Sequence, residues 1–334
     1  MRWSELGIHS IEAVNLAKTY KTRERRGIFR GFTREIEALR GVNFRVERGE
    51  IFSLLGPNGA GKTTTVKILA TLLKPDRGEA YVEGYSVLKE PEKVREAIGL
   101  TLTVEKGFYP KLTGFENLVY FAMLHHMPMG EAKSRAREVL ELVGLAADAD
   151  RLFEEYSLGM KAKLALARAL IHDPPVLILD EPTIGLDPVA ARGVRRLLVE
   201  LKKRGKTIML TTHNMAEAEM LSDHVAMLNR GRIVAYGTVE ELKQLVSDSR
   251  VVRVEVPESP LGLEARLGNI GELLTVTSSN GVTCLRICCK RGEEMEVLYE
   301  LLGKLRGIGV RILRAEVEEP SLEDVFVKLA GGES

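Results

Sequence analysis

The sequence predicts an α/β domain with a mostly parallel sheet, followed by a small α+β domain. Up to about residue 246, short apolar runs alternate with helical patterns, which is typical of a parallel sheet covered by helices on both faces. After residue 246 the order becomes strand, helix, strand, strand, helix, strand, which is the order of a ferredoxin-like fold. We therefore expect one domain over 1–246 and a second over 247–334.

Hydrophobic periodicity assigns the elements of the first domain. The expected strands are 11–16, 36–47, 51–55, 176–179, 207–211, 224–228 and 232–236. The expected helices are 65–73, 91–98, 114–127, 130–143, 159–171, 188–204 and 238–246. Because helices dominate the middle of this domain, the sequence predicts a helical subdomain over about 103–172.

The second domain shows shorter, β-rich patterns. The expected strands are 251–256, 272–278, 282–288 and 310–313, and the expected helices are 260–268 and 293–306. Ser321 is expected to cap a last helix, with Asp324 three residues later completing a capping box. No group of residues in this domain has the pattern of a catalytic site.

Composition excludes several classes of protein. The 334 residues carry 48 Lys and Arg against 47 Asp and Glu, so charge gives no argument for a nucleic-acid partner. The three cysteines, Cys284, Cys288 and Cys289, lack metal-ligand spacing and fit a reducing cytosol better than a disulfide framework. No apolar run reaches the ~18 residues that cross a bilayer, and no signal-peptide core is present. If the protein works at a membrane, other chains must supply the span.

A basic stretch follows the first strand. It contains Lys21, Arg23, Arg25, Arg26, Arg30 and Arg34. We interpret it as an exposed loop or a hairpin extension. A solvated insertion is the favoured interpretation, and binding to anionic lipid headgroups or to a partner is the alternative.

A complete phosphate-binding loop of the pattern G-x-x-x-x-G-K-T lies between the strand 51–55 and the helix 65–73. Its residues are Gly56, Pro57, Asn58, Gly59, Ala60, Gly61, Lys62, Thr63 and Thr64. The glycines let successive N–H groups point into one concavity at the positive end of the helix, which holds a polyphosphate. Lys62 supplies a charge for the β- and γ-phosphates, and the Thr63 hydroxyl is placed to bind Mg²⁺.

Asp180 and Glu181 end a strand of four apolar residues, Val176 to Leu179. The carboxyl end of such a strand faces the phosphate loop in an open α/β sheet. We therefore expect Asp180 to hold Mg²⁺ through its water shell and Glu181 to act as the general base on an attacking water. Capping of the next helix is the weaker alternative, because Pro182 follows at once.

Over about residues 10–245 the chain resembles the ATP-binding subunits of ABC transporters. The resemblance implies that Tyr20 stacks on adenine and that His213, after the strand 207–211, senses the γ-phosphate. It implies that Ser157 and Gly159, in Tyr-Ser-Leu-Gly-Met, meet the γ-phosphate held by the other subunit. It also implies that the loop ending at Asp187 communicates across a dimer.

Two stretches depart from the family pattern. The signature has Leu158 where a glycine is usual and Met160 where a glutamine is usual. The loop 102–110, where the family carries a glutamine that contacts Mg²⁺ and water, contains none. Thr103 or Glu105 could substitute for it, and we favour Thr103 as the metal contact.

The resemblance is greatest to type-2 ABC exporters of drugs, polysaccharides and lipids. It implies a P-loop NTPase cassette, binding of ATP and Mg²⁺, and a homodimer or paired ATPase subunits around two ATP molecules. It further implies an integral membrane permease as partner and a cytoplasmic, peripheral location on the inner face of the cell membrane. The alternatives are an ABC ATPase without a transport role and a nucleotide-gated regulatory module with weak hydrolysis.

Overall fold

The computed structural model describes residues 9–26, 30–102, 107–246, 249–257, 272–279 and 281–331. The chain divides into two compact units, Met1–Tyr236 and Gly237–Ser334. The division precedes α8 (Val239–Gln244), whereas the sequence suggested a boundary after residue 246. The reason is that α8 packs against the last helix, α11 (Leu322–Gly331). None of the helices in the described ranges combines the length and the apolarity that crossing a bilayer requires.

The centre of the first unit is a six-stranded sheet. In spatial order its strands are β10 (Arg232–Thr238), β9 (His224–Asn229), β3 (Ile51–Leu55), β8 (Thr207–Thr212), β7 (Val176–Asp180) and β6 (Ile98–Thr101). The pairs β9–β3, β3–β8, β8–β7 and β7–β6 are parallel. Strands β3, β7 and β8 are buried along their whole length, as apolar runs in a doubly covered sheet must be. The predicted parallel sheet is confirmed.

Helices and a second sheet cover the two faces of this sheet. The helices of this unit in the described ranges are α1 (Lys62–Leu69), α2 (Pro91–Ala97), α3 (Gly114–Leu124), α4 (Met129–Leu142), α5 (Leu158–Ala169), α6 (Pro188–Lys203) and α7 (Met215–Leu221). One apolar core joins alternate residues of β7 and β8 to α3, α4, α5 and α6. The other core joins apolar residues of β3, β7 and β8 that point to the opposite face with α1 and with an antiparallel sheet.

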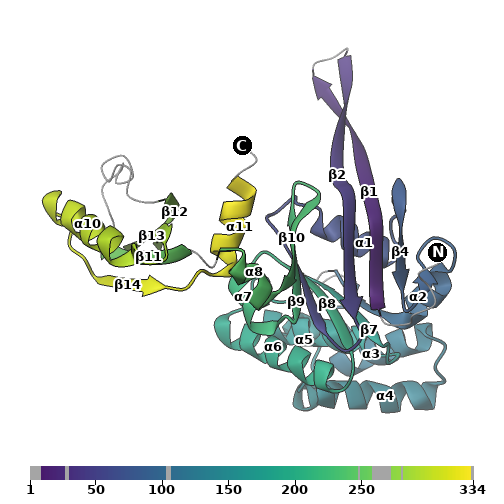
Figure 1. Cartoon of the computed structure of the whole chain (residues 1–334). Helices are drawn as coiled ribbons and strands as arrows, with labels where there is room; N and C mark the ends of the chain where they lie inside the picture. The colour runs from purple at the N-terminus through teal and green to yellow at the C-terminus, as the bar shows by residue number, and fades with distance from the viewer. Residues whose placement is uncertain are drawn as a thin grey trace. The chain divides into compact units, whose positions relative to one another are not determined.

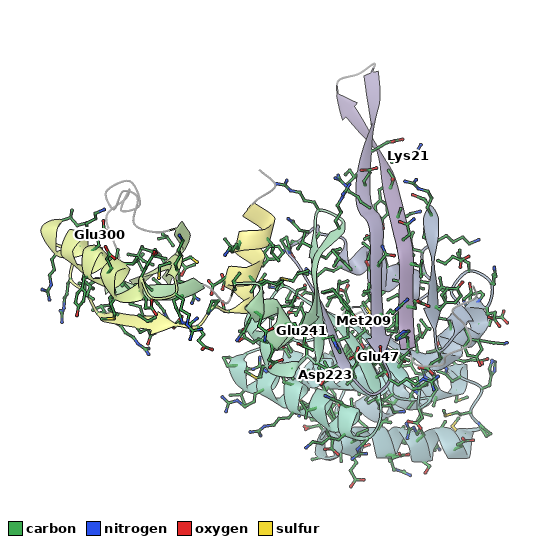
Figure 2. The ribbon with its side chains drawn as sticks, viewed as in Figure 1. Lys21, Glu47, Met209, Asp223, Glu241 and Glu300 are labelled. Atoms are coloured by element: carbon green, nitrogen blue, oxygen red, sulfur yellow. The ribbon has the colours of Figure 1, made fainter. Side chains whose placement is uncertain are left out.

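The antiparallel sheet contains a long two-stranded ribbon (Figure 1). Its strand order is β2 (Arg30–Glu47), β1 (His9–Arg26), β4 (Arg77–Val82) and β5 (Tyr85–Ser86). The last described pair between β1 and β4 is Ala17 with Arg77, but β1 and β2 stay paired as far as Arg26 and Arg30. The basic stretch is therefore a hairpin extension. Figure 2 shows Lys21 on this ribbon and Glu47 at the far end of β2.

A stacked pair of histidines, His125 and His172, lies beside β6. The ring centroids are 4.1 Å apart and the planes 8° apart. The Nε2 atom of His172 donates to the Ile98 carbonyl at 3.0 Å, and among the described residues its buried Nδ1 has no hydrogen-bond partner. Burial is the main cause that lowers the pKa of His172, to about 4, and the neighbouring His125 lowers it further.

Acid should therefore destabilise the folded chain through His172. In the unfolded chain this ring protonates near its ordinary pKa of 6.5, but in the folded chain only near 4. The unfolded state thus binds more protons between these values, and stability falls as the pH drops from 6.5 to 4, by up to about 3 kcal/mol. Urea unfolding of the wild type and His172→Phe at pH 7 and pH 4.5 checks this. The variant should lose less stability between the two pH values, and equal losses would contradict the assignment.

The second unit is built on a four-stranded antiparallel sheet. Its order is β12 (Glu272–Ser279), β13 (Val282–Lys290), β11 (Ser249–Pro257) and β14 (Arg314–Glu318), all joined by antiparallel pairs. Counted along the chain this is order 2-3-1-4, as the ferredoxin-like prediction requires. Helix α10 (Glu294–Gly307) packs on one face through Leu301 and Leu305. The helix expected at 260–268 lies outside the described residues.

The predicted strand 310–313 is wrong, because the strand forms at Arg314–Glu318. Val310 and Ile312 instead pack against the core under α10, and the Val310 amide donates to the Leu305 carbonyl at 2.9 Å, closing the helix end. These two apolar residues therefore pack against the core although they lie in a loop. The strand itself carries the charged residues Arg314, Glu316 and Glu318, which bridge to neighbouring side chains.

Charged groups fill the other face of the second sheet and hold the start of α11. Arg286 bridges Asp324 at 2.7 Å and Glu318 at 3.0 Å. Asp324, only 3% exposed, also accepts from the Ser321 amide at 2.8 Å, while its own amide donates to the Ser321 hydroxyl at 3.4 Å. The predicted capping box is confirmed. Of the three free cysteines, Cys289 lies in the apolar core, and burial raises the pKa of its thiol.

Candidate active site

Three loops meet at one edge of the parallel sheet because their strands end in register. Leu55 at the end of β3 pairs with Thr212 at the end of β8, and Asp180 at the end of β7 pairs with Thr211. The residues that follow these ends are Gly56, Glu181 and His213. The parallel register thus brings the phosphate loop, the strand-end acids and the histidine together, as expected for an open α/β sheet.

The phosphate loop requires its glycines. Gly59 and Gly61 have φ of 81° and 115°, which side chains other than glycine rarely adopt. A Cβ at Gly56 would lie 2.2 Å from the Leu228 carbonyl oxygen, and one at Gly61 would lie 2.5 Å from the Ala38 oxygen. The backbone can therefore curl between β9 and β2 only without side chains at these points.

Lys62 lies inside the loop that it closes. Its Nζ donates to the carbonyls of Gly56 at 2.6 Å and Pro57 at 3.2 Å, and the side chain is only 6% exposed. As the first residue of α1 it also stands at the positive end of the helix. The loop and its lysine together form a concavity suited to an anion.

Two hydroxyl groups orient Asp180. Its Oδ2 accepts from the Thr63 hydroxyl at 2.9 Å, and its Oδ1 accepts from the Thr211 hydroxyl at 2.5 Å. Asp180 is 9% exposed. The Thr63 hydroxyl and the Asp180 carboxylate thus lie close enough to face one small cation. Among the described residues no group of three or more His, Cys, Asp or Glu could hold a metal, so these two residues offer only part of a coordination shell.

Glu181 lies between the lysine and the histidine. Its Oε1 is 3.3 Å from Lys62 Nζ, and its Oε2 is 2.8 Å from Nδ1 of His213. Its backbone has a φ of 50°, in the left-handed region that non-glycine residues seldom occupy, and its amide donates to the Thr211 carbonyl at 3.1 Å. Backbone strain of this kind is held in place by its surroundings and gathers at functional sites.

Tyr20 joins this cluster from the antiparallel sheet. Its hydroxyl lies 3.4 Å from the Thr64 hydroxyl on α1, and 37% of the residue is exposed. The two-stranded ribbon continues past it from Lys21 onward. An exposed aromatic ring therefore stands beside the phosphate loop, where it could stack on a flat base.

A second cluster forms where α5 and α6 begin. Ser157 caps α5, and its hydroxyl accepts from the Met160 amide at 3.3 Å. Asp187 caps α6 by accepting from the amides of Val189 and Ala190, both at 2.9 Å. A Cβ at Gly159 would lie 2.7 Å from the Ala190 Cβ, so glycine is needed for the two helix starts to approach.

Met160 and Leu158, the two residues that depart from the expected signature, differ in their surroundings. Met160 packs against the helical core, so this position faces inward, where a thioether suits better than an amide. Leu158 is 39% exposed beside Gly185. Tyr156, just before the signature, donates from its hydroxyl to the Asp148 carbonyl at 2.7 Å. Burial raises the pKa of Tyr156 to about 12.

The structure thus sorts the expected site residues into two groups. The first group contains Tyr20, Lys62, Thr63, Thr64, Asp180, Glu181 and His213. The second group contains Ser157, Gly159 and Asp187. No hydrogen bond or ion pair within the described ranges joins the groups. Thr103, the expected metal contact, lies outside the described residues.

Sequence reasoning missed two residues that support the first group. Thr211 bonds Asp180 and the Glu181 amide. Glu217 on α7 is 1% exposed and accepts from the hydroxyls of Thr183 and Thr212. The available signals were weak: a threonine near a strand end, and a glutamate four residues after His213, which the structure places in the first turn of α7.

Comparison with known proteins identifies the family of this chain. A family model described as ABC transporter matches residues 39–184. The fluoroquinolones export ATP-binding protein of Mycobacterium tuberculosis is 41% identical over 294 residues, which cover 88% of this chain and 88% of the relative. The linearmycin resistance ATP-binding protein of Bacillus subtilis is 36% identical over 298 residues, which cover 88% of this chain and 93% of the relative.

A solved structure is similar to the first part of this chain in fold. It is an ATP-binding cassette in a dimeric post-hydrolysis state bound to ADP and Pi. The TM-score is 0.60 at 29% identity, and the match covers 68% of this chain and 98% of the solved one. The phosphate loop, the strand-end acids and the length of these matches lead to one conclusion: the chain belongs to the ABC transporter family, as an ATP-binding subunit that hydrolyses ATP to power transport.

Proposed function

We propose that two copies of this chain close head to tail around two ATP molecules and drive a separate membrane permease, in the direction of export. The observation that carries the proposal is the meeting of Lys62, Thr63, Asp180, Glu181 and His213 at one edge of the sheet. This set supplies charge for phosphates, oxygen ligands for a cation and a carboxylate next to a histidine.

Mg²⁺ fits the oxygen pair of Thr63 and Asp180. This ion is usually bound by one or two protein oxygens, with water and substrate phosphates completing the shell, which matches a hydroxyl 2.9 Å from a carboxylate oxygen. When bound, Mg²⁺ would neutralise charge on the phosphates. Lys62 would bind the β- and γ-phosphates from inside the loop. Tyr20 would stack on adenine.

Glu181 is the proposed general base. Its carboxylate lies between Lys62 and His213. A water bound beside Lys62 would therefore lie next to the Glu181 carboxylate and near the γ-phosphate. Glu181 would take the proton of that water as it attacks the γ-phosphorus. His213 would donate from Nδ1–H to the Glu181 carboxylate and, when the ring carries a proton on both nitrogens, from Nε2–H to a γ-phosphate oxygen.

The second cluster is the proposed other half of the site. Ser157 and Gly159 stand at the N-terminus of α5, which is favourable for an anion. Within the described ranges no bond links them to the phosphate loop of the same chain, so a second copy would have to present them. Asp187 would lie in the same contact, where the cap of α6 fixes its loop. The dimeric state of the related cassette supports this assignment.

Export is proposed from the relatives, whose names describe fluoroquinolone export and linearmycin resistance. The permease would be an integral membrane protein touched through residues 103–115, and the subunit would sit at the inner face of the cell membrane. Thr103 remains the proposed replacement for the family glutamine. Co-purification of the full chain with a membrane-spanning protein tests this partnership. An ABC ATPase without a transport role would co-purify with no membrane-spanning protein.

ATP-dependent dimerisation tests the proposal directly. The purified full-length Glu181→Gln chain should be monomeric without nucleotide and dimeric with Mg·ATP, as measured by light scattering. EDTA should return it to monomer, because the proposed site needs the cation between Thr63 and Asp180. A chain that stays monomeric with saturating Mg·ATP would contradict the head-to-tail arrangement.

A further inference from the structure

Glu217 is a buried acid for which the mechanism above has no use. It lies on α7 with 1% of its surface exposed. One oxygen, Oε2, accepts from the Thr183 hydroxyl at 2.8 Å and from the Thr212 hydroxyl at 3.2 Å. The other oxygen, Oε1, accepts no hydrogen bond from the described residues. A buried carboxyl oxygen that accepts no hydrogen bond is costly, and its ion-pair contact with Arg195 is long, at 3.8 Å, so the burial of this acid calls for a reason.

The positions of the two threonines suggest the reason. Thr183 comes two residues after Glu181, and Thr212 comes directly before His213. Glu217 therefore joins the loop that carries the proposed base to the loop that carries the histidine. Glu217 also contacts α6, the helix that Asp187 caps, because Arg195 Nη1 lies 3.8 Å from Oε1.

The contact between Glu181 and His213 joins side chains from two different loops. His213 reaches Glu181 from a side chain that is 47% exposed. Glu181 adopts its left-handed backbone at φ 50°. A contact of 2.8 Å between groups on two different loops depends on the loops holding their spacing. A shared buried acceptor beside each loop provides such spacing, because a change in one loop must move the other.

We propose that Glu217 is a positioning residue that holds Glu181 and His213 in the geometry for hydrolysis by binding Thr183 and Thr212 together. The inference rests on the proposed roles of Glu181 and His213. Glu217 itself does not contact the nucleotide in this proposal. Its loss should therefore slow the chemical step and leave ATP binding nearly unchanged, since displacement of positioned groups lowers kcat more than it raises KM.

Steady-state ATP hydrolysis by the full chain tests the inference. Glu217→Ala should lower kcat about 10–100-fold and change KM by less than about 3-fold. Glu217→Gln keeps one carbonyl oxygen for the threonines and should recover most of the rate. Thr183→Val and Thr212→Val should each lower kcat, but neither should lower it further in the Glu217→Ala background, because residues that act as one unit are not additive.

Leu221→Ala is the matched control. Leu221 is a buried residue of the same helix, so its truncation loosens α7 through packing. It should lower the melting temperature and leave kcat unchanged well below that temperature. If Glu217→Ala fails to fold, Glu217→Gln and the threonine variants carry the test. A kcat within 2-fold of wild type in the threonine variants, or strict additivity with Glu217→Ala, would overturn the inference. A wild type that releases no phosphate would instead overturn the proposed function.

Discussion

Glu181→Gln should bind Mg·ATP nearly as the wild type does and hydrolyse it about 10²–10⁴-fold more slowly. The amide has the shape of the carboxylate and can still accept from His213, so the loop between β7 and α6 should keep its form. It cannot take a proton from water, because it lacks the basic oxygen. Single-turnover phosphate release measures the rate, and equilibrium binding of a fluorescent ATP analogue measures the affinity.

Glu141→Gln serves as the control for this change, because Glu141 is an exposed carboxylate on α4. It should leave both the rate and the affinity unchanged. Hydrolysis by Glu181→Gln at the wild-type rate would show that another group takes the proton. Loss of ATP binding in this variant would show that Glu181 serves the loop structure instead of the chemistry.

Lys62→Ala should lose affinity for ATP as well as activity. The Lys62 Nζ lies within the curl of the phosphate loop, and hydrogen bonds to charged groups contribute about 1.5–3 kcal/mol. Removal of the lysine should therefore weaken Mg·ATP binding about 10–100-fold, and hydrolysis should fall below detection. Isothermal calorimetry on the full chain measures the affinity.

Lys67→Ala is the matched control for the lysine, since Lys67 is an exposed lysine on the same helix. Its removal should change ATP affinity little, because its charge points to solvent. Equal losses in the two variants would indicate that overall charge near α1 attracts the nucleotide. That result would contradict the specific role given to Lys62.

Much of the fold could be predicted because local pattern and burial agree. The run Ile51–Leu55 is apolar and wholly buried as β3, and the glycines after it have no other use than a tight curl. Asp180 was predictable as a site residue since a carboxylate after four buried apolar residues belongs at a strand end. The phosphate loop and the acids follow from short stretches of sequence, which is why they were found.

The elements that were missed depend on their neighbours. Strand β6 has only four residues directly after α2, with no turn residue to separate them, and it forms because β7 offers a partner. Strand β4 carries Arg77 and Glu79 among its six residues, so its pattern resembles a loop. Sheet pairing over long sequence distances decides both, and periodicity does not report such pairing.

The site was predictable in its residues but not in its connections. Asp187 directly before Pro188 has the pattern of a helix cap, but nothing in the sequence indicates that Glu217 lies between two threonines that are 29 residues apart in the chain, Thr183 and Thr212. The Glu217 contacts exist because β7 and β8 pair in register, which brings the loops that follow them together. A capping carboxylate and a nucleotide-contacting one look alike in a sequence, because both follow a turn and precede a helix.

Mixing two inactive variants tests the shared site most directly. Lys62→Ala inactivates the phosphate loop and Ser157→Arg inactivates the second cluster, so a dimer made of either variant alone should not hydrolyse ATP. In an equal mixture half of the dimers are mixed, and each mixed dimer has one of its two sites intact, so about a quarter of wild-type phosphate release should return. No recovery in a mixture shown by light scattering to contain dimers would mean that ATP is not hydrolysed between two copies of this chain.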